Sequence, residues 1–287
     1  MMIIAWMTWI EILRKRVFVM TVLMTLAFLA VYTFALHAIA SHEMSVQVGQ
    51  PVDLLDNYVE SVLFLAMGLY VANFTVAYLA IFSSAGTIST EIENGLLLAI
   101  LPRPLCRWRV YLGKWLGYTA WGVLYGALMF WAVVLIVHAF IHFPLLADSL
   151  WKSFGVFELI PITLVSLSIL GSVFMPTLGN GVAMTLLFGL GTIGGFVQRL
   201  SPVETQAAMN KVGLITSLLI PTNATYYRMM SEMMGGTNML VGSQAVYSRL
   251  GLFAGGPVPS DAFLVYTGLY ICLVVAFGMW KFMRKDI

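Results

Sequence analysis

An all-α integral membrane fold with six transmembrane helices is predicted by the composition of this sequence and by the length of its apolar runs. The 287 residues are 60% hydrophobic and only 10% charged, whereas a soluble domain usually carries about 25% charged residues. Six apolar runs each approach the ~20 residues that cross a hydrocarbon core about 30 Å thick. Most of the surface must therefore face lipid, and we treat the chain as a single polytopic transmembrane domain, residues 1–287.

Residues 1–16 predict an amphipathic helix that lies in the membrane interface ahead of the first span. Trp6 and Trp9 would sit at the level of the lipid headgroups. The polar positions recur at helical spacing: Thr8, Glu11 and Lys15. The charged residues follow the apolar run, which is the reverse of a secretory signal, so we expect no cleaved signal peptide.

The six predicted spans follow in order at residues 17–40, 62–81, 111–138, 155–175, 181–197 and 262–280. The breaker-rich residues 176–180 (PTLGN) separate the fourth span from the fifth. Two polar residues fall within spans, Asn73 in the second and Glu158 in the fourth, where Glu158 is expected close to the outer interface. Because a polar side chain at membrane depth is costly, both are candidates for a translocation pathway.

The distribution of Lys and Arg predicts the orientation of the chain. Basic residues gather in cytoplasmic loops of membrane proteins. With a cytoplasmic N-terminus, the cytoplasmic segments hold most of the 15 basic residues, in three groups: Arg14, Lys15 and Arg16; Arg103, Arg107, Arg109 and Lys114; Lys281, Arg284 and Lys285. We therefore predict that both termini are cytoplasmic.

Residues 199–260, before the last span, are too long for a simple connection. Residues 212–220 are apolar but too few to cross the membrane, and Pro221 ends this run. A second short helix is expected after Asn223. The pattern predicts re-entrant or interfacial helices on the outer side, although a different span count would place the segment on the other side.

Between the second and third spans, residues 90–101 predict a short cytoplasmic helix. Thr90 and Glu93 have the T-x-x-E spacing of a capping box, and Pro102 would end the helix shortly after Ile100. Acidic residues in the first turn suit the helix dipole. The helix would expose an apolar stripe of Ile92, Leu96 and Ile100. Such a stripe needs a cover, from lipid headgroups, the rest of the chain or another protein.

This region, residues 83–118, resembles the coupling-helix region of ABC-2 type transporter permeases. In that family a Glu-x-x-x-Gly element precedes a run similar to L-L-A-x-P-x-x-R-W-x-x-x-x-G-K. The matching residues are Glu91, Gly95, Leu97, Leu98, Ala99, Pro102, Pro104, Arg107, Trp108, Gly113 and Lys114. The helix at 1–16 also resembles the elbow helix of the family, and the layout of six spans is similar.

The resemblance implies a permease subunit of an ABC exporter. Two copies, as a homodimer, would pair in the cytoplasmic (inner) membrane of a prokaryote. Each copy would dock its coupling helix onto a separate ATP-binding cassette subunit. The residues expected to couple to that ATPase are Thr90, Glu91, Ile92, Glu93, Gly95, Leu96, Ile100 and Arg103. The expected elbow-helix residues are Trp6, Trp9, Glu11, Arg14, Lys15 and Arg16.

The chain is not expected to be an enzyme by itself. It has no G-x-x-x-x-G-K-[ST] phosphate loop, so ATP and Mg²⁺ would bind the partner subunit, and no cofactor is expected on this chain. No nucleic-acid partner is expected.

A metal site is a weaker interpretation of the histidines and methionines. His138 and His142 share a helix face, and Met230 and Met234 follow in the outer segment. Imidazole with thioether would suit Cu(I). Interfacial histidine and the adaptable packing of methionine explain the same residues without a metal, and we predict none.

Three alternatives remain open: an intramembrane enzyme, a non-ABC membrane transporter and a membrane immunity or assembly factor. An enzyme would need a catalytic set such as H-E-x-x-H or G-x-S-x-G, and neither motif occurs. A secondary transporter would show inverted halves with paired broken helices, which are not evident. The substrate does not follow from the sequence.

Overall fold

The computed structural model describes residues 2–14, 16–46, 54–95, 107–141, 146–200, 206–234 and 259–285. Every regular element in these ranges is a helix: α1 (Met2–Arg14), α2 (Arg16–Val46), α3 (Leu54–Ser84), α4 (Ser89–Glu93), α6 (Arg107–Ile141), α7 (Ala147–Phe174), α8 (Thr177–Leu200), α9 (Gln206–Leu219), α10 (Thr222–Met233) and α12 (Asp261–Met283). The prediction of an all-α fold is confirmed.

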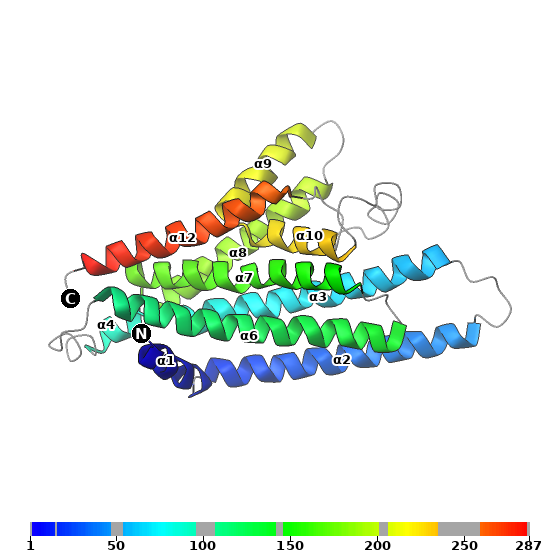
Figure 1. The fold of residues 1–287 in the computed structure, drawn as a ribbon, viewed down its shortest axis with the longest axis horizontal. Helices are drawn as coiled ribbons and strands as arrows, with labels where there is room; N and C mark the ends of the chain where they lie inside the picture. Colours follow the sequence, from blue (N-terminus) through cyan, green and yellow to red (C-terminus); the bar gives the residue numbers. More distant parts are fainter. Residues whose placement is uncertain are drawn as a thin grey trace.

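Six of these helices, α2, α3, α6, α7, α8 and α12, are long and apolar enough to cross a membrane. They lie side by side, and successive members run in alternating directions along the bundle (Figure 1). The prediction of six membrane-spanning helices is confirmed. Helices α1 and α4 and the C-terminal end of α12 lie at one end, which we call the α4 end. Helices α9 and α10 lie toward the other, which we call the α10 end.

The centre of the bundle is α7. Of its most apolar stretch, 78% is buried inside the protein, compared with 6% for α2. Helix α7 contacts α3, α6, α10 and α12. Its Phe157 packs against Phe130 of α6 with the ring centroids 5.6 Å apart. Helix α7 is therefore in contact with most of the bundle, whereas α2 lies at the periphery.

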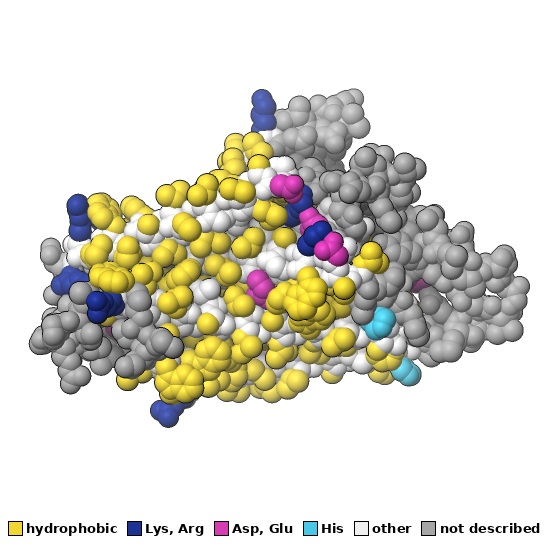
Figure 2. All heavy atoms as spheres, in the orientation of Figure 1, with side chains coloured by type: hydrophobic (Ala, Val, Ile, Leu, Met, Phe, Trp, Pro, Cys, Tyr) yellow, Lys and Arg dark blue, Asp and Glu magenta, His cyan; other side chains and the backbone are white. Residues whose placement is uncertain are grey.

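The outer face of the bundle is apolar, as a lipid-facing surface must be. Hydrophobic side chains cover most of the face in Figure 2, and Lys and Arg side chains gather at the α4 end. Large hydrophobic residues are exposed on the peripheral helices, for example Phe34 of α2, Leu186 of α8 and Leu269 of α12. This apolar belt separates the two polar ends of the molecule.

Helix α1 lies with its polar side toward the bundle. Thr8 is buried against Gly117 of α6, where an added Cβ would lie 2.8 Å from the Thr8 Cβ. The Tyr118 hydroxyl donates to Oε1 of Glu11 at 3.2 Å. The large residues on the other side are exposed: Trp6, Met7, Ile10 and Leu13. The amphipathic helix predicted at residues 1–16 is thus present over Met2–Arg14, with its polar side against α6. In lipid, apolar side chains gain little from packing together, whereas polar and small groups favour helix contacts.

Helices α9 and α10 form a hairpin that enters the bundle from the α10 end. Pro221 occupies the break between them, as predicted from the sequence, and Ile220 lies against Gly191 of α8. The Tyr226 hydroxyl of α10 donates to the carbonyl of Ala66, in the middle part of α3, at 2.9 Å. Helix α10 therefore packs against the middle of α3, and the choice between a re-entrant and an interfacial segment stays a prediction.

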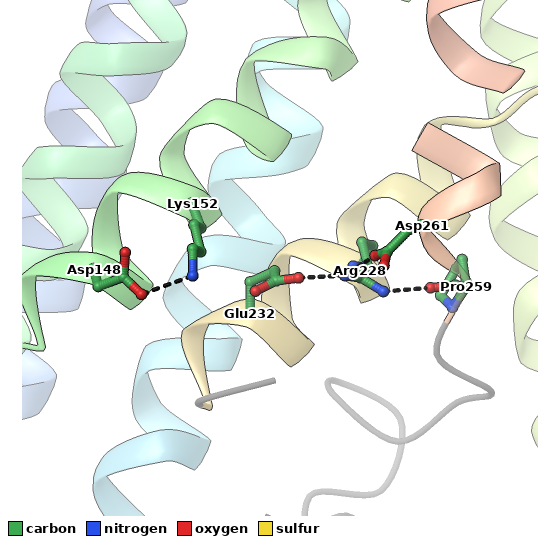
Figure 3. A network of polar contacts seen from close by, with 6 residues as sticks. All are labelled: Asp148, Lys152, Arg228, Glu232, Pro259 and Asp261. Carbon is green, nitrogen blue, oxygen red and sulfur yellow. Dashed lines mark hydrogen bonds and ion pairs between the residues drawn. The ribbon is translucent and has the colours of Figure 1, made fainter. Parts of the chain in front are cut away.

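A row of charged side chains crosses α7, α10 and α12 near the α10 end (Figure 3). Within α7, Lys152 pairs with Asp148 at 2.7 Å. Arg228 of α10 pairs with Glu232 in the same helix and with Asp261 at the start of α12. The Arg228 side chain is only 11% exposed, whereas that of Asp261 is 88% exposed. Arg228 thus ties the hairpin to the last long helix.

Candidate functional site

The sequence motif that resembles a coupling helix forms α4, which follows α3 after a single turn. The first backbone N–H groups of this segment already have carbonyl partners: Thr87 N–H donates to Ser84, Thr90 N–H to Gly86 and Ile92 N–H to Ile88. The residue before the helix is Ile88, and no side chain caps it. The predicted capping box of Thr90 and Glu93 is therefore wrong. Because the carbonyls that follow α3 satisfy these donors, a side-chain cap is not needed.

Helix α4 ends earlier than predicted. Its last residue is Glu93, and Asn94 follows as the C-cap. Gly95 has a φ of +65°, a left-handed conformation that glycine adopts at low cost and that commonly ends a helix. A single helix over residues 90–101 is therefore not formed. Three predicted coupling residues lie outside the described residues: Leu96, Ile100 and Arg103.

A buried lysine of α6 holds α4 in place. Lys114 forms an ion pair with Glu91, and its Nζ donates to the carbonyl of Thr87 at 2.8 Å. The side chains of Lys114 and Glu91 are 8% and 22% exposed. Removing one partner of a buried pair leaves an uncompensated charge, which is strongly destabilising. The pair therefore fixes the position of α4 relative to α6.

Hydroxyl groups connect α4 to the start of α8. The Oγ of Ser89 and the Oγ1 of Thr90 lie 3.0 and 3.1 Å from the Oγ1 of Thr177. The close approach requires a small residue beside them, because a Cβ on Gly86 would lie 2.6 Å from Thr90 Oγ1 and 2.9 Å from Thr177 Cγ2. Helix α4 thus contacts two of the long helices through polar side chains.

An asparagine ties the same region to α7. Asn180 is fully buried, and its Nδ2 donates to the carbonyl of Ala85 at 2.9 Å and to that of Ser168 at 2.7 Å. Ala85 belongs to the turn that leads into α4, and Ser168 lies in α7. One side chain of α8 therefore joins the α4 turn to the central helix.

The first half of α6 connects the remaining helices of the α4 end. Trp115 Nε1 donates to Ser166 Oγ of α7 at 2.8 Å. Arg107 donates to the carbonyl of Lys285, just beyond α12, at 2.8 Å. Thr8 of α1 packs at Gly117, as described above. Helix α6 is therefore in contact with α1, α4, α7 and α12, and a displacement of α4 would reach all of them through it.

The exposed face of α4 is polar. Thr90, Glu93 and Asn94 are exposed, whereas Ile92 is partly buried and packs against the hydrophobic core. The expectation that Ile92 contributes to an exposed apolar stripe is therefore wrong, because the rest of the chain already covers it. Glu91 is directed to Lys114, which makes it a residue that positions α4.

The predicted elbow residues have different environments. Trp9 packs edge-on against Trp121 of α6 with the ring centroids 5.0 Å apart, and Arg14 at the end of α1 is exposed. Lys15 lies outside the described residues, and Arg16 is the first residue of α2.

The two polar residues predicted for a pathway are both buried, in different helices. Asn73 of α3 is 3% exposed and Glu158 of α7 is 7% exposed. Neither the Oδ1 of Asn73 nor the two carboxylate oxygens of Glu158 has a hydrogen-bond partner in the part of the chain that the structure describes. Glu158 lies about three turns into α7, because α7 begins at Ala147 and has 3.6 residues per turn.

The candidate metal ligands are not brought together in the described residues. Met230 and Met234 belong to the hydrophobic core. His138 lies near the end of α6, and His142 is outside the described residues. In the described ranges, no three His, Cys, Asp or Glu side chains form a group that could hold a metal ion.

Sequence reasoning missed three residues that build the α4 junction: Lys114, Thr177 and Asn180. Lys114 was noted as a position that matches the permease motif, but its contact with Glu91 joins separate helices and leaves no local pattern. Thr177 and Asn180 lie in the segment identified only as a helix breaker. The available signal was that these two polar residues lie directly after a helix breaker between two spans, a position where polar side chains can be buried.

Comparison with known proteins gives one match that spans the chain. A family model described as "ABC-2 family transporter protein" matches residues 2–287. No curated protein matches the chain.

Proposed function

The chain belongs to the ABC-2 family of transporter proteins, and from this premise we propose that it is the permease subunit of an exporter, coupled through α4 and α6 to a separate ATP-binding cassette subunit. Members of this family are the membrane components of transporters, and membership implies association with a membrane and with an ATP-binding subunit. The coupling route, the outward direction and the pairing of two copies are the parts that we propose.

The buried ion pair between Glu91 and Lys114 is the observation that carries the coupling proposal. A short helix with an exposed polar face is useful for coupling only if its displacement moves the long helices. The ion pair makes α4 move with α6, and the hydroxyl contacts to Thr177 add α8. A push on the exposed face of α4 would therefore be passed to the bundle rather than absorbed by the loop.

We further propose that the α4 end faces the cytoplasm of a prokaryotic cell. The basic residues of α6 and α12 at this end, such as Arg107, Arg109 and Lys281, support this orientation through the positive-inside rule. ATP and Mg²⁺ would then be bound and hydrolysed by the partner, on the side where ATP is available. The α9–α10 hairpin would enter from the outer side.

We propose that two copies of the chain form the translocation path between them, as the family resemblance implies. Helix α2 has little of its apolar stretch covered within one copy. Its exposed face is therefore free to contact either lipid or a second copy.

The experiment that tests the coupling proposal is purification of the tagged chain from native membranes in a gentle detergent. The wild type should retain an ATPase, identified by its activity and by mass spectrometry. Glu91→Ala should lose most of that ATPase while the permease stays folded, and Leu96→Asp tests the sequence-predicted surface beyond Gly95. The matched control is Asp148→Asn, which breaks an exposed ion pair at the α10 end.

The double variant Glu91→Lys, Lys114→Glu separates coupling from a simple loss of charge. It keeps an ion pair at the same place with the signs reversed but loses the hydrogen bond to the Thr87 carbonyl, so it should recover part of the ATPase that Glu91→Ala loses. If no ATPase accompanies even the wild type, the proposed function is wrong.

A further inference from the structure

Glu158 of α7 has a buried carboxyl group that the coupling route does not use. Its side chain is 7% exposed, and neither carboxylate oxygen has a hydrogen-bond partner among the described residues. It lies 11 positions after Ala147, the first residue of a 28-residue helix, which places it about 16 Å along the axis. Glu158 therefore lies well inside a membrane-spanning helix.

The carboxylate lies in a seam between α6 and α7 that two glycines create. An added Cβ at Gly126 would lie 2.9 Å from Oε2 and 3.1 Å from Oε1 of Glu158. One turn away, Gly122 faces Pro161 of α7, with an added Cβ 3.2 Å from the Pro161 Cβ. The small residues thus leave space for the carboxylate where a larger side chain would exclude it.

The same seam contains a further hydrogen-bond acceptor. Pro161 lies inside α7 and has no backbone N–H, so the carbonyl of Phe157 lacks its usual intrahelical donor. Phe157 directly precedes Glu158 in the sequence. The Phe157 carbonyl loses the N–H that would lie at position 161, and the two carboxyl oxygens of Glu158 have no donor among the described residues.

Three cations of the described helices, Lys152, Lys114 and Arg228, are engaged elsewhere. Lys152, the basic residue closest to Glu158 along α7, pairs with Asp148 at 2.7 Å. Lys114 pairs with Glu91 at the α4 end, and Arg228 pairs within the charged row at the α10 end. A buried carboxylate without a partner is costly. Its partner is therefore to be sought outside the described chain.

We propose that Glu158 binds the cationic nitrogen of an amphiphilic molecule, an amine or quaternary ammonium. This proposal rests on the proposed transport function and names the substrate class for it. A bare metal ion fits less well, because hard cations such as Ca²⁺ take six to eight oxygen ligands, and the seam supplies few. An organic cation needs only one carboxylate for its charge and gains from apolar surroundings.

The test is equilibrium binding of two lipophilic cations, radiolabelled dodecylamine and dodecyltrimethylammonium, to the purified chain in nanodiscs without its ATPase. The wild type should bind both saturably, and uncharged dodecanol should not compete. Glu158→Gln keeps the shape but removes the charge, so it should weaken binding by about tenfold or more. Gly126→Ala should also weaken binding, because the added methyl group displaces the carboxylate.

The matched control is Ser153→Ala, which removes another buried oxygen of α7 that lacks a partner in the described residues and should bind both cations like the wild type. A melting curve of each variant shows that it is folded. Equal binding by the wild type and Glu158→Gln, or no saturable binding of either cation, would overturn the proposal. Since no ATPase is present, this outcome is independent of whether the chain recruits one.

Discussion

Replacing Lys114 with Met tests whether the ion pair with Glu91 holds α4 to the bundle. Methionine keeps the length of the side chain and removes both the charge and the hydrogen bond to the Thr87 carbonyl. Breaking a fully buried pair costs about 3–5 kcal/mol, whereas an exposed pair is worth about 0–1 kcal/mol. Lys114 is 8% exposed and Glu91 is 22% exposed, so we expect an intermediate value of about 2 kcal/mol.

A loss of this size should appear as faster local opening of α4. About 2 kcal/mol corresponds to a change of roughly 30-fold in an equilibrium constant. The backbone N–H groups of Thr90, Ile92 and Asn94 donate to carbonyls in and before α4, and their hydrogen exchange reports the opening. Exchange of peptides that cover these residues, measured by mass spectrometry in detergent, should therefore be roughly 30-fold faster in Lys114→Met.

Two controls make the result specific. Lys152→Met breaks an ion pair whose side chains are 57% and 80% exposed, and it should leave exchange in α4 unchanged. Peptides from the buried second half of α7 should exchange at the same rate in all variants. If α4 exchanges at the wild-type rate in Lys114→Met, the ion pair does not position α4, and the coupling route described above is refuted.

Further substitutions test other contacts, each by the melting midpoint in one detergent. Gly117→Val should detach α1 and lower the midpoint, because an added Cβ already lies 2.8 Å from that of Thr8, whereas Gly155→Ala meets nothing within 4 Å and should be neutral or slightly stabilising; equal effects would refute the packing of α1. Asn180→Ala removes the donor for two buried carbonyls and should destabilise by about 1–3 kcal/mol; an unchanged midpoint would contradict this role. Arg228→Met leaves Glu232, whose side chain is 16% exposed, without its partner and should cost about 2–3 kcal/mol. Asp261→Asn, at an 88% exposed site, should cost less than about 1 kcal/mol, and equal losses would contradict the difference in burial.

The long helices were predictable because the apolar runs that cross a membrane are the strongest signal in such a sequence. Their ends were not predictable from hydropathy. Helix α7 begins at Ala147, ahead of the predicted span, because Leu150 and Ser153 in its first turns are buried in the bundle. The helical hydrogen bonds continue beyond the apolar stretch. For this reason Glu158 lies about three turns into α7, although it is near the start of the predicted span.

Periodicity identified the polar stripe of α1 but not the direction in which it faces. In water, the apolar side of such a helix turns inward. Here Thr8 and Glu11 face α6, because a protein in lipid has no reason to hide its apolar residues from the solvent. The sequence pattern is the same in both cases, so only the tertiary contacts distinguish them.

The motif located the candidate site, but it did not predict the contacts between helices that build the site. Glu91 and Lys114 both match the permease pattern, and their ion pair joins two helices that are separate in the sequence. The capping box failed as a prediction because the rule considers only neighbours within one helix. The carbonyls of Ser84, at the end of α3, and of Gly86, in the turn that follows, already satisfy the donors.

The central claim, that α4 is the docking point for an ATP-binding subunit, is tested most directly by photo-crosslinking from Glu93 in native membranes. Glu93 is on the exposed face of α4, and a crosslinker at Leu269, which is 60% exposed on α12, is the control. We predict that position 93 captures an ATP-binding cassette protein, identified by mass spectrometry, and that position 269 does not. Capture of that protein from position 269 alone, or from neither position, would contradict the account.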